Sequence, residues 1–394
     1  PLADELNDCS QKYKAQFKEL LNGFNLHIEG PEAENVDSFN YLAYWYTQNA
    51  LVHYTSPHGL EQYSGAAWGT RDVCQGPAEY FLATNNFQRL KEIILHVFSQ
   101  QYLDNGNWPQ WFMIDRYYRI QQNESHGDII VWPMRLLGLY LESTKDYSIL
   151  EEMIPYTNIE NSEFTAENYS VLEHLENEID NIVKSFIEGT SLSCYGGGDW
   201  DDTLQPANKQ YADHMVSGWT VALTYEGLTI LSRELKGVND ELATKYAALC
   251  EAIKADYNKY IMEDNIPAGF IHFTEHGIDK IIHPTDNRTN MKYRLLPFNR
   301  GIISELFTEE QKNIAIESIN KHLKHPDGVR LMDKTVPYKG GNNTYFTRAE
   351  TASNFGREIG LQYCHAHIRY CEAMAKVGNA DDLYKGFRHW LTSW

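Results

Sequence analysis

The feature that most constrains the fold is a spacing of apolar residues at three and four positions, which recurs along nearly the whole chain. Residues 86–98 and 168–187 show it most clearly, the second with Val171, Leu175, Ile179 and Ile182. Residues three and four apart share one face of an α-helix, so the pattern predicts amphipathic helices. Weaker versions predict further helices at about 4–22, 38–54, 72–84, 129–143, 213–234, 240–260, 309–323, 356–376 and 380–390.

Helix starts are also marked in the sequence. Predicted N-terminal caps are Asp37-Ser38, Thr84-Asn85, Asn239-Asp240 and Thr308-Glu309, since short polar side chains can accept the first free backbone N–H groups of a helix. Strand signals are rare, and residues 268–273 are expected to form one arm of a small hairpin. No alternation of strands and helices predicts a doubly wound sheet.

About a dozen helices with few strands predict an all-α fold, an (α/α)6 barrel of six antiparallel helical hairpins closed into a ring. Its long aromatic loops, at 55–71, 102–127, 188–211, 263–299 and 325–355, are expected to gather around a cleft at one end. No Pro/Ser-rich linker interrupts the chain, so one domain over residues 1–394 is expected. Pro1 is not an initiator methionine, and we expect this domain to be a piece of a longer protein.

Charge and cysteine usage narrow the partners. The net charge of -20 disfavours nucleic acid and anionic membranes, both of which need a basic face. No apolar run is long enough to span a bilayer. Six widely spaced cysteines form no metal-like pair, which predicts free buried thiols and a cytoplasmic location. The aromatic share of 13% suits sugar binding but also suits a thick helical core.

The sharpest candidate site is an acidic loop that follows three glycines, Gly196 to Gly198. Asp199, Asp201 and Asp202 flank Trp200 within four residues. Three such close carboxylates repel one another, so at least one should stay protonated near neutral pH unless a cation lies nearby. A protonated carboxyl is the proton donor that a glycosidic oxygen needs. A solvated acidic loop or a calcium loop is the alternative, although the EF-hand spacing is absent.

Three further segments carry candidate binding residues. Arg71 and Asp72 could hold adjacent sugar hydroxyls, with Gln75 beside them, or could form a structural ion pair in which Asp72 caps a helix. Trp108, next to a proline, could form a flat platform for a sugar, and a segment with Asp128 and Trp132 follows it. As an alternative, Asp128 is a helix cap.

The last segment runs from Arg348 and Glu350 through Arg357 to His365 and His367. The two histidines differ by two positions and therefore face different sides of a helix, which is not the spacing of a zinc pair. His365 with an arginine could bind an anion, but a lone helical histidine is more often a core or surface residue. No metal site is expected.

Taken together, these segments resemble the catalytic barrel of the inverting glycoside phosphorylases, which act on cellobiose, chitobiose and cellodextrins. The resemblance runs from about Tyr41 to Asp382 and is strongest to the 1,2-β-oligoglucan branch. It rests on residues 54–65, 68–72 and 198–202, and on the run from Arg348 to His367. Two departures stand out, since the family's N-terminal β-sandwich and its threonine-glycine phosphate loop are absent from these 394 residues.

The resemblance implies roles for single residues. Asp202 matches the family's general acid, and His365 matches its phosphate-site histidine, with Arg348 or Arg357 beside it. Arg71, Asp72, Asp128 and Trp132 match sugar-binding positions. The implied activity is phosphorolysis of β-glucosides to α-glucose 1-phosphate, with phosphate as co-substrate, no cofactor, and family members often dimeric. The rivals are an inverting hydrolase with Glu350 as base, and a silent carbohydrate-binding domain.

Overall fold

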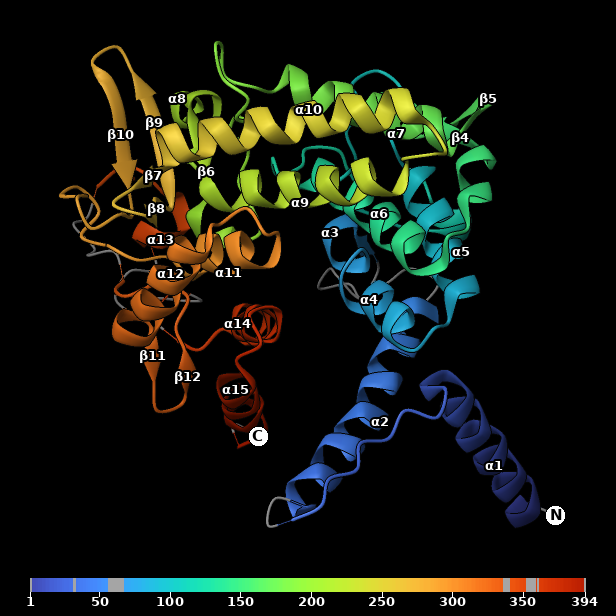
Figure 1. Ribbon diagram of the computed structural model, residues 1–394. Coiled ribbons are helices and arrows are strands. Elements are labelled where there is room, and N and C mark those ends of the chain that lie inside the picture. The colour runs from blue at the N-terminus through green and yellow to red at the C-terminus, as the bar shows by residue number, and fades with distance from the viewer. Residues whose placement is uncertain are drawn as a thin grey trace. The chain divides into compact units, whose positions relative to one another are not determined.

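The computed structural model describes residues 2–30, 33–55, 67–335, 341–351, 359 and 361–392. Helices dominate these residues, which confirms the predicted all-α class (Figure 1). The chain divides into two compact units. Unit 1 comprises Pro1–Glu124 and Leu139–Glu176, and unit 2 comprises Ser125–Gly138 and Asn177–Trp394. The single domain and the closed ring of six hairpins stay predictions.

Unit 1 begins with a pair of long helices, α1 (Leu2–Leu21) and α2 (Ala33–Thr55). Shorter helices and two small antiparallel sheets follow: α3 (Thr70–Val73), α4 (Gly76–Ala83), α5 (Phe87–Phe98), β1 (Trp68–Gly69) with β2 (Trp111–Phe112) and β3 (Gln121–Gln122), and β4 (Met153–Thr157) with β5 (Phe164–Ser170). The apolar stripe of α5 is buried, with Leu90, Ile93 and Val97 fully enclosed. The spacing that predicted this helix therefore also supplies part of the core of unit 1.

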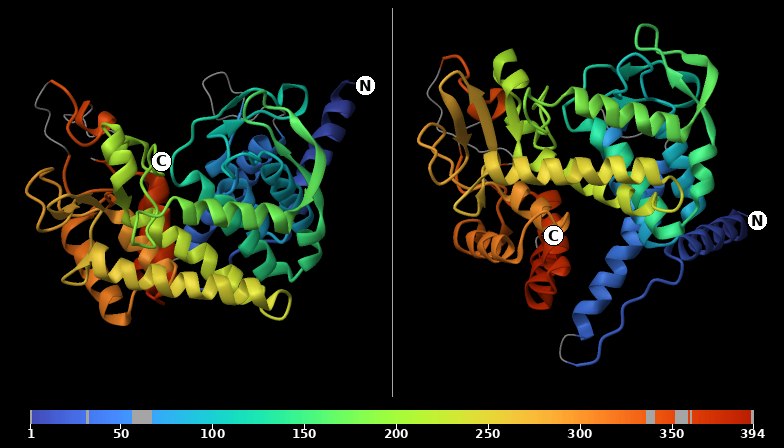
Figure 2. Two further views of the ribbon diagram at one scale, coloured as in Figure 1. Left: turned by 90° about the horizontal axis from the view of Figure 1, so that it is seen from above. Right: turned by 45° about the horizontal axis from the view of Figure 1, so that its top comes forward.

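Two boundaries between the units fall inside helices. They lie in α6 (Trp132–Thr144) and in α7 (Val171–Lys184). Unit 2 then contains α9 (Gly218–Glu234), α10 (Asp240–Asp256), α11 (Leu295–Ile303), α12 (Glu309–His322), α14 (Cys364–Lys376) and α15 (Ala380–Thr392), with the short α8 (Lys209–His214) and α13 (Thr347–Thr351). Helices α9 and α10 lie side by side in both figures, joined by a five-residue turn (Figures 1 and 2).

Helix α9 is buried on all sides. Fourteen of its 17 residues are buried, including the charged Glu226 and Glu234. Gly227 lets another segment approach closely, because a Cβ there would lie 2.9 Å from the Cε of Met134. A helix of this kind is the interior of a helical domain rather than its surface.

Strands in unit 2 are few and short, as expected. The predicted hairpin is confirmed: β9 (Phe270–Thr274) pairs antiparallel with β10 (Gly277–Ile281) on one edge and with β6 (Met215–Ser217) on the other. Two-residue pairs complete the set, namely β7 (Met262–Glu263) with β8 (Ile266–Pro267), and β11 (Lys324–His325) with β12 (Gly328–Val329).

Several predicted helix limits are wrong for identifiable reasons. The helix expected at 72–84 is two helices, because Pro77 lies in the first turn of α4 and residues before a proline avoid the helical region. Within the helix expected at 356–376, α14 begins at Cys364 with the extended Tyr363 as its N-cap residue, while 356–358 and 360 lie outside the described residues. Of the predicted caps, Asn239 and Thr308 are confirmed. Helix α2 begins before Asp37, and α5 is preceded by Asn86 instead of the Thr84-Asn85 pair.

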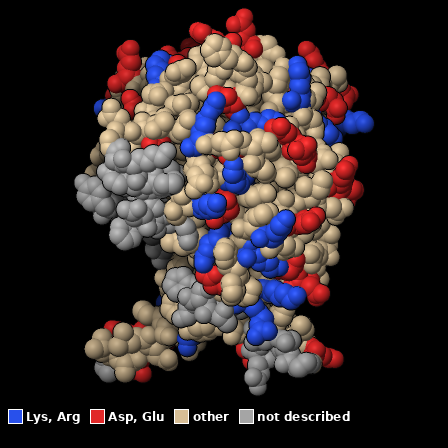
Figure 3. Space-filling view, turned by 90° about the vertical axis from the view of Figure 1, so that its left-hand side faces the viewer, with Lys and Arg blue, Asp and Glu red and all other residues tan. Residues whose placement is uncertain are grey.

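All six cysteines are free. Cys74, Cys250 and Cys371 are buried, but Cys9 and Cys364 are exposed, so the expectation of buried thiols is wrong for those two. None of the described helices combines the length and the low polarity that crossing a membrane would require. One face of the molecule shows basic and acidic side chains interspersed (Figure 3), and unit 2 contains ion pairs such as Arg330–Asp327 at 2.9 Å.

Candidate active site

The acidic loop of unit 2 is held by backbone contacts with residues 126–127. The N–H of Gly127 donates to the carbonyl of Gly198 at 2.9 Å, and His126 forms a β-bridge with Gly196. Gly196 and Gly198 have φ values of 60° and 143°, which side chains other than glycine rarely adopt. A Cβ on Gly127 would lie 2.3 Å from the carbonyl oxygen of Tyr195. The glycines therefore allow two backbone segments to touch.

Asp199 is the buried anchor of the loop. Its two carboxylate oxygens each lie 2.9 Å from Nη2 of Arg294, and Ser217 Oγ donates to Oδ2 at 2.6 Å. Both Asp199 and Arg294 have no exposed side-chain surface. Burial alone would lower the pKa of the Arg294 guanidinium, but the carboxylates of Asp199 and Asp201 outweigh it and raise the pKa. The ion pair therefore fixes the loop through Asp199, and a contact of Asp199 with a sugar stays a prediction.

Asp201 is buried as well. Its backbone N–H donates to Oδ1 of Asp199 at 3.0 Å, and its own Oδ1 accepts the N–H of Thr203 at 3.2 Å. Its Oδ2 lies 3.9 Å from Arg294. Asp201 thus caps the short 3₁₀ turn η4 (Asp202–Leu204) that carries the next aspartate. With 2% of its surface exposed, it supports the turn and offers no surface to a substrate.

Asp202 is the member of the trio that faces outward. Its side chain is 42% exposed, with His126 Nδ1 3.4 Å from Oδ1 and Arg348 Nη1 3.9 Å from Oδ2. The cations that the sequence argument allowed for are therefore present: Arg294 under the buried pair and Arg348 beside Asp202. Of the three loop carboxylates, all of them described, Asp202 alone can reach a solvent-borne molecule.

A backbone ladder brings Arg348 to this position. The N–H of Ala207 donates to Tyr345 O at 2.9 Å, and the N–H of Thr347 donates to Gln205 O at 3.0 Å. These bonds dock α13 against η4, although the two segments are more than 140 residues apart in sequence. The arrangement places the Arg348 guanidinium next to the Asp202 carboxyl group, a contact that local sequence could not predict.

Glu350 binds backbone N–H groups of its own segment. Its carboxylate oxygens, Oε1 and Oε2, accept hydrogen bonds from the backbone N–H groups of Thr344 at 2.5 Å, Tyr345 at 2.5 Å and Phe346 at 2.8 Å. Three N–H donors to one carboxylate organise the turn that precedes Arg348. The carboxylate is therefore occupied by its own segment, and neither sugar binding nor activation of water is its evident use here.

Trp200 and His365 form an aromatic group beside the acidic loop. The Trp200 ring lies 5.4 Å from His365, 5.5 Å from Tyr363 and 6.3 Å from Trp219 between centroids. Trp200 is 7% exposed and His365 is exposed. His367 points elsewhere, as predicted, and is buried with Nε2 2.8 Å from the carbonyl of Gly386.

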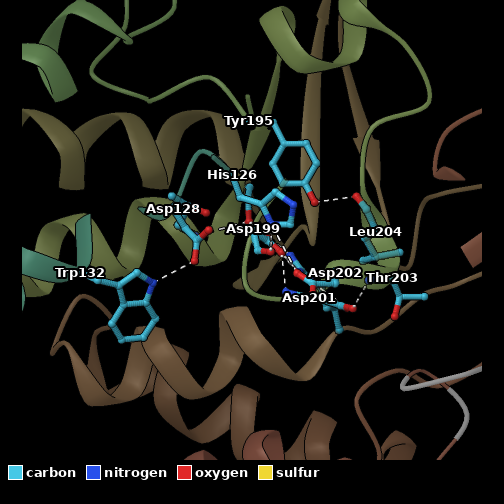
Figure 4. Close-up of polar contacts among 12 residues, drawn as sticks. His126, Asp128, Trp132, Tyr195, Asp199, Asp201, Asp202, Thr203 and Leu204 are labelled. Atoms are coloured by element: carbon cyan, nitrogen blue, oxygen red, sulfur yellow. Dashed lines mark hydrogen bonds and ion pairs between the residues drawn. The ribbon is translucent and has the colours of Figure 1, made fainter. Parts of the chain in front are cut away.

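Asp128 and Trp132 meet as a pair, but in the interior. Trp132 Nε1 donates to Asp128 Oδ2 at 2.9 Å, and both side chains are fully buried (Figure 4). Asp128 precedes the 3₁₀ turn η2 (Ile129–Val131), yet its side chain makes no capping bond. Beneath them, Arg135 and Arg300 hold the carboxylate of Glu226. Burial would raise the pKa of Glu226, but the two guanidinium groups outweigh it and keep the pKa low.

The remaining predicted residues lie in unit 1 or outside the described residues. Arg71 and Asp72 lie on α3, whose N-cap is Gly69, so the alternative of Asp72 as a cap is wrong. The Gln75 side chain donates to the carbonyl of Arg71 at 3.2 Å. Trp108 is fully buried and donates to Val97 O at 2.7 Å, so it is a core residue with no surface for a sugar. Arg357 lies outside the described residues.

Two residues next to the loop were missed from the sequence. His126 lies in a segment that the sequence singled out for Asp128, and only its place beside Gly127 could have drawn attention to it. Arg294 has no local signal, because it meets Asp199 across 95 residues. Among the described residues, no group of three or more His, Cys, Asp or Glu side chains could hold a metal ion.

Comparison with known proteins shows what this chain is similar to. Residues 79–391 match the family "Glycosyl hydrolase 94 superfamily, catalytic domain". A 1,2-beta-oligoglucan phosphorylase from Listeria innocua is 50% identical over 95% of this chain and 34% of its own length. A cellobionic acid phosphorylase from Neurospora crassa is 24% identical over 65% of this chain and 30% of its own. The chain thus spans about a third of the length of these curated relatives.

Solved structures share the fold at low identity. A glycosidase in complex with glucose is 11% identical with a TM-score of 0.54, covering 91% of this chain and 84% of its own. A rhamnosidase from Klebsiella oxytoca with rhamnose bound is 10% identical with a TM-score of 0.52, covering 83% of this chain and 49% of its own. At this identity the likeness concerns the helical fold.

Proposed function

The chain belongs to the glycosyl hydrolase 94 superfamily, and we propose that it performs inverting phosphorolysis of β-linked gluco-oligosaccharides, with β-1,2 linkages favoured. The proposed products are α-glucose 1-phosphate and a shortened sugar. The observation that carries the proposal is that the three loop carboxylates have different environments. Asp199 and Asp201 are buried beside Arg294, and Asp202 faces outward. The name of the Listeria relative supports the β-1,2 preference.

In the proposed reaction, Asp202 donates its proton to the glycosidic oxygen as the bond between that oxygen and the anomeric carbon breaks. A phosphate oxygen attacks the anomeric carbon from the opposite face, which inverts its configuration. The glucose 1-phosphate releases its proton to solvent and Asp202 takes up a proton from solvent, so that the acid is restored before the next turnover. Phosphate is already an anion and needs no protein base, and we propose no cofactor beyond this co-substrate.

Arg348 and His365 are the proposed phosphate-binding residues, and Arg357 remains a further candidate. Arg348 is 44% exposed and lies 3.9 Å from the acid, within reach of an anion that approaches Asp202. His365 is exposed, and its ring lies 5.4 Å from that of Trp200 between centroids. A guanidinium can bind two phosphate oxygens at once and offsets the repulsion between phosphate and the acidic loop.

The hydrolytic alternative needs a second carboxylate that activates water, at roughly 6.5–9.5 Å from the acid. Glu350 was its candidate, and three backbone N–H groups occupy that carboxylate. The structure therefore supports the phosphate-dependent reaction over hydrolysis by this pair. The six free cysteines support a cytoplasmic location, and a homodimer stays a prediction.

The test measures glucose 1-phosphate and free glucose from β-1,2-, β-1,3- and β-1,4-gluco-oligosaccharides, with and without phosphate. It is run on this chain and on any longer parent protein. We expect phosphate-dependent release of glucose 1-phosphate, which falls by roughly 10²–10⁴ in kcat in Asp202→Asn. Asp213→Asn is the matched control, because it removes an exposed carboxylate on α8 that pairs with Lys209. Free glucose formed at the same rate without phosphate would reject the proposal.

A further inference from the structure

The backbone ladder that docks α13 against η4 has an inner face and an outer face. Phe346 forms a β-bridge with Pro206, and the N–H of Ala207 donates to Tyr345 O at 2.9 Å. Residues opposite each other in an antiparallel ladder share a face, and neighbours along a strand alternate between faces. Phe346 is fully buried against Phe270, with 5.1 Å between ring centroids, so it marks the inner face. Tyr345 therefore belongs to the outer face.

The same ladder connects Tyr345 to the proposed acid. Gln205 lies opposite Thr347, two residues along from the pair of Ala207 and Tyr345, and so belongs to the outer face as well. Two residues of extended chain span about 7 Å. Gln205 directly follows the turn η4 that begins with Asp202. A chain of sugars that extends from Asp202 along this ladder therefore meets Tyr345 after its first members.

Tyr211 of α8 and Tyr345 form an aromatic surface, which we call the tyrosine platform. Their ring centroids are 5.6 Å apart and their planes are tilted by 49°. Both side chains are partly exposed. His272 of β9 packs against Tyr211 with 4.8 Å between centroids and is only 6% exposed, so it supports the platform from the interior. Helix α8 lies beside β9 for this reason (Figure 1).

The platform has hydrogen-bonding groups at its edge. Among the residues that the structure describes, neither the Tyr211 nor the Tyr345 hydroxyl has a hydrogen-bond partner. Burial raises the pKa of both phenols, so both stay protonated and can donate as well as accept. The charge of Arg288 partly opposes this rise in pKa at both phenols, so its guanidinium lies near both. Arg288 pairs with Asp279, and a pair without net charge suits a neutral ligand with many hydroxyls.

We propose, building on the proposed function, that the tyrosine platform binds the leaving part of a β-linked gluco-oligosaccharide, at least one sugar beyond the bond that Asp202 cleaves. Release of glucose 1-phosphate removes the terminal sugar alone, so every other sugar lies on the leaving side of the acid. A longer substrate presents further rings to the platform, and the shortest substrate does not reach it. The platform thus determines the preference for chain length and takes no part in bond cleavage.

The experiment measures kcat/KM in the parent protein for a series of β-gluco-oligosaccharides, from the shortest one that is cleaved to those two and four sugars longer. Tyr211→Ala and Tyr345→Ala should each lower kcat/KM for the longest substrate by roughly 3–10-fold, mainly through KM, and that for the shortest by less than about twofold. Tyr345→Phe should lose less than Tyr345→Ala, because it keeps the ring.

Tyr260→Ala is the matched control. Tyr260 is also partly exposed, but it packs on Phe273 with 5.7 Å between centroids, and Phe273 points to the face of β9 opposite His272. Its loss should leave the dependence on chain length unchanged. If both platform variants lower kcat/KM equally for the shortest and the longest substrate, damage to the fold explains the loss and the proposal is overturned. An unchanged value for the longest substrate also overturns it.

The dependence on chain length is read separately from the reaction that the site performs. Cleavage without phosphate that loses its length dependence in the platform variants would reject the proposed function and support the platform. For a chain that cleaves nothing, isothermal titration calorimetry with the same oligosaccharides gives Kd, which Tyr345→Ala should raise roughly 3–10-fold for the longest one alone. Equal Kd values for the longest oligosaccharide in wild type and Tyr345→Ala would overturn the proposal there too.

Discussion

Arg294→Met tests the buried anchor of the acidic loop. The substitution removes the guanidinium that lies 2.9 Å from both oxygens of Asp199, 3.3 Å from Ser217 Oγ and 3.9 Å from Asp201 Oδ2. The two buried carboxylates of Asp199 and Asp201 then remain in the interior without this cation. Breaking a buried pair in this way costs about 3–5 kcal/mol of unfolding free energy, or roughly 4–6 °C in Tm if the 394 residues unfold together.

The assay is urea and thermal unfolding followed by circular dichroism, with Arg330→Met as the matched control. Arg330 pairs with Asp327 at 2.9 Å, and the Asp327 side chain is 54% exposed, so the loss of Arg330 should cost less than about 1 kcal/mol. Adding Asp199→Asn to Arg294→Met should recover part of the loss, because one stranded charge is removed. Equal losses in the two arginine variants, or no recovery in the double variant, would refute the reasoning.

Three further outcomes are expected. Glu350→Gln should cost about 1–2 kcal/mol of unfolding free energy by weakening the turn before α13, as measured by denaturation. It should keep more than a tenth of kcat in the activity assay, whereas substitution of a general base would lower kcat far more. Gly127→Ala should lose roughly 1–3 kcal/mol against the carbonyl of Tyr195, measured by denaturation, whereas Gly76→Ala, with open space around its Cβ, should be neutral or stabilising. Burial lowers the pKa of His174 to about 4; because the unfolded chain binds its proton near pH 6.5, stability should fall by up to about 3 kcal/mol between pH 6.5 and 4, and His174→Gln should flatten that part of the curve.

Local chemistry predicted the helices whose ends it marks. Helix α12 begins where Thr308 and Gln311 form a capping box, and α10 begins after the cap at Asn239. Local chemistry did not predict the secondary structure where pairing with a distant strand determines it. Met215–Ser217 continues the helical spacing of α9 but forms a strand that pairs with β9. Ser217 can then serve as the N-cap of α9, with its hydroxyl accepting the N–H of Thr220.

The candidate site divides in the same way. The glycines and aspartates of the acidic loop identified the loop and the role of Asp202 as a hypothesis, because close like charges imply unequal environments. Which aspartate faces outward depends on Arg294, which is 95 residues from Asp199 in sequence. The occupied carboxylate of Glu350 likewise depends on the fold of its own turn, which no spacing of residue types specifies.

The ion pair beneath the loop changes what an approaching anion meets. In a protein with a net charge of -20, a run of three aspartates would be expected to repel phosphate. Arg294 offsets one charge of that run from the inside and Arg348 lies next to Asp202, so the three carboxylates face two guanidinium groups. The local charge around Asp202 is therefore close to balanced, although the molecule as a whole is strongly anionic. Modest salt should change the rate of anion binding there less than the overall charge suggests.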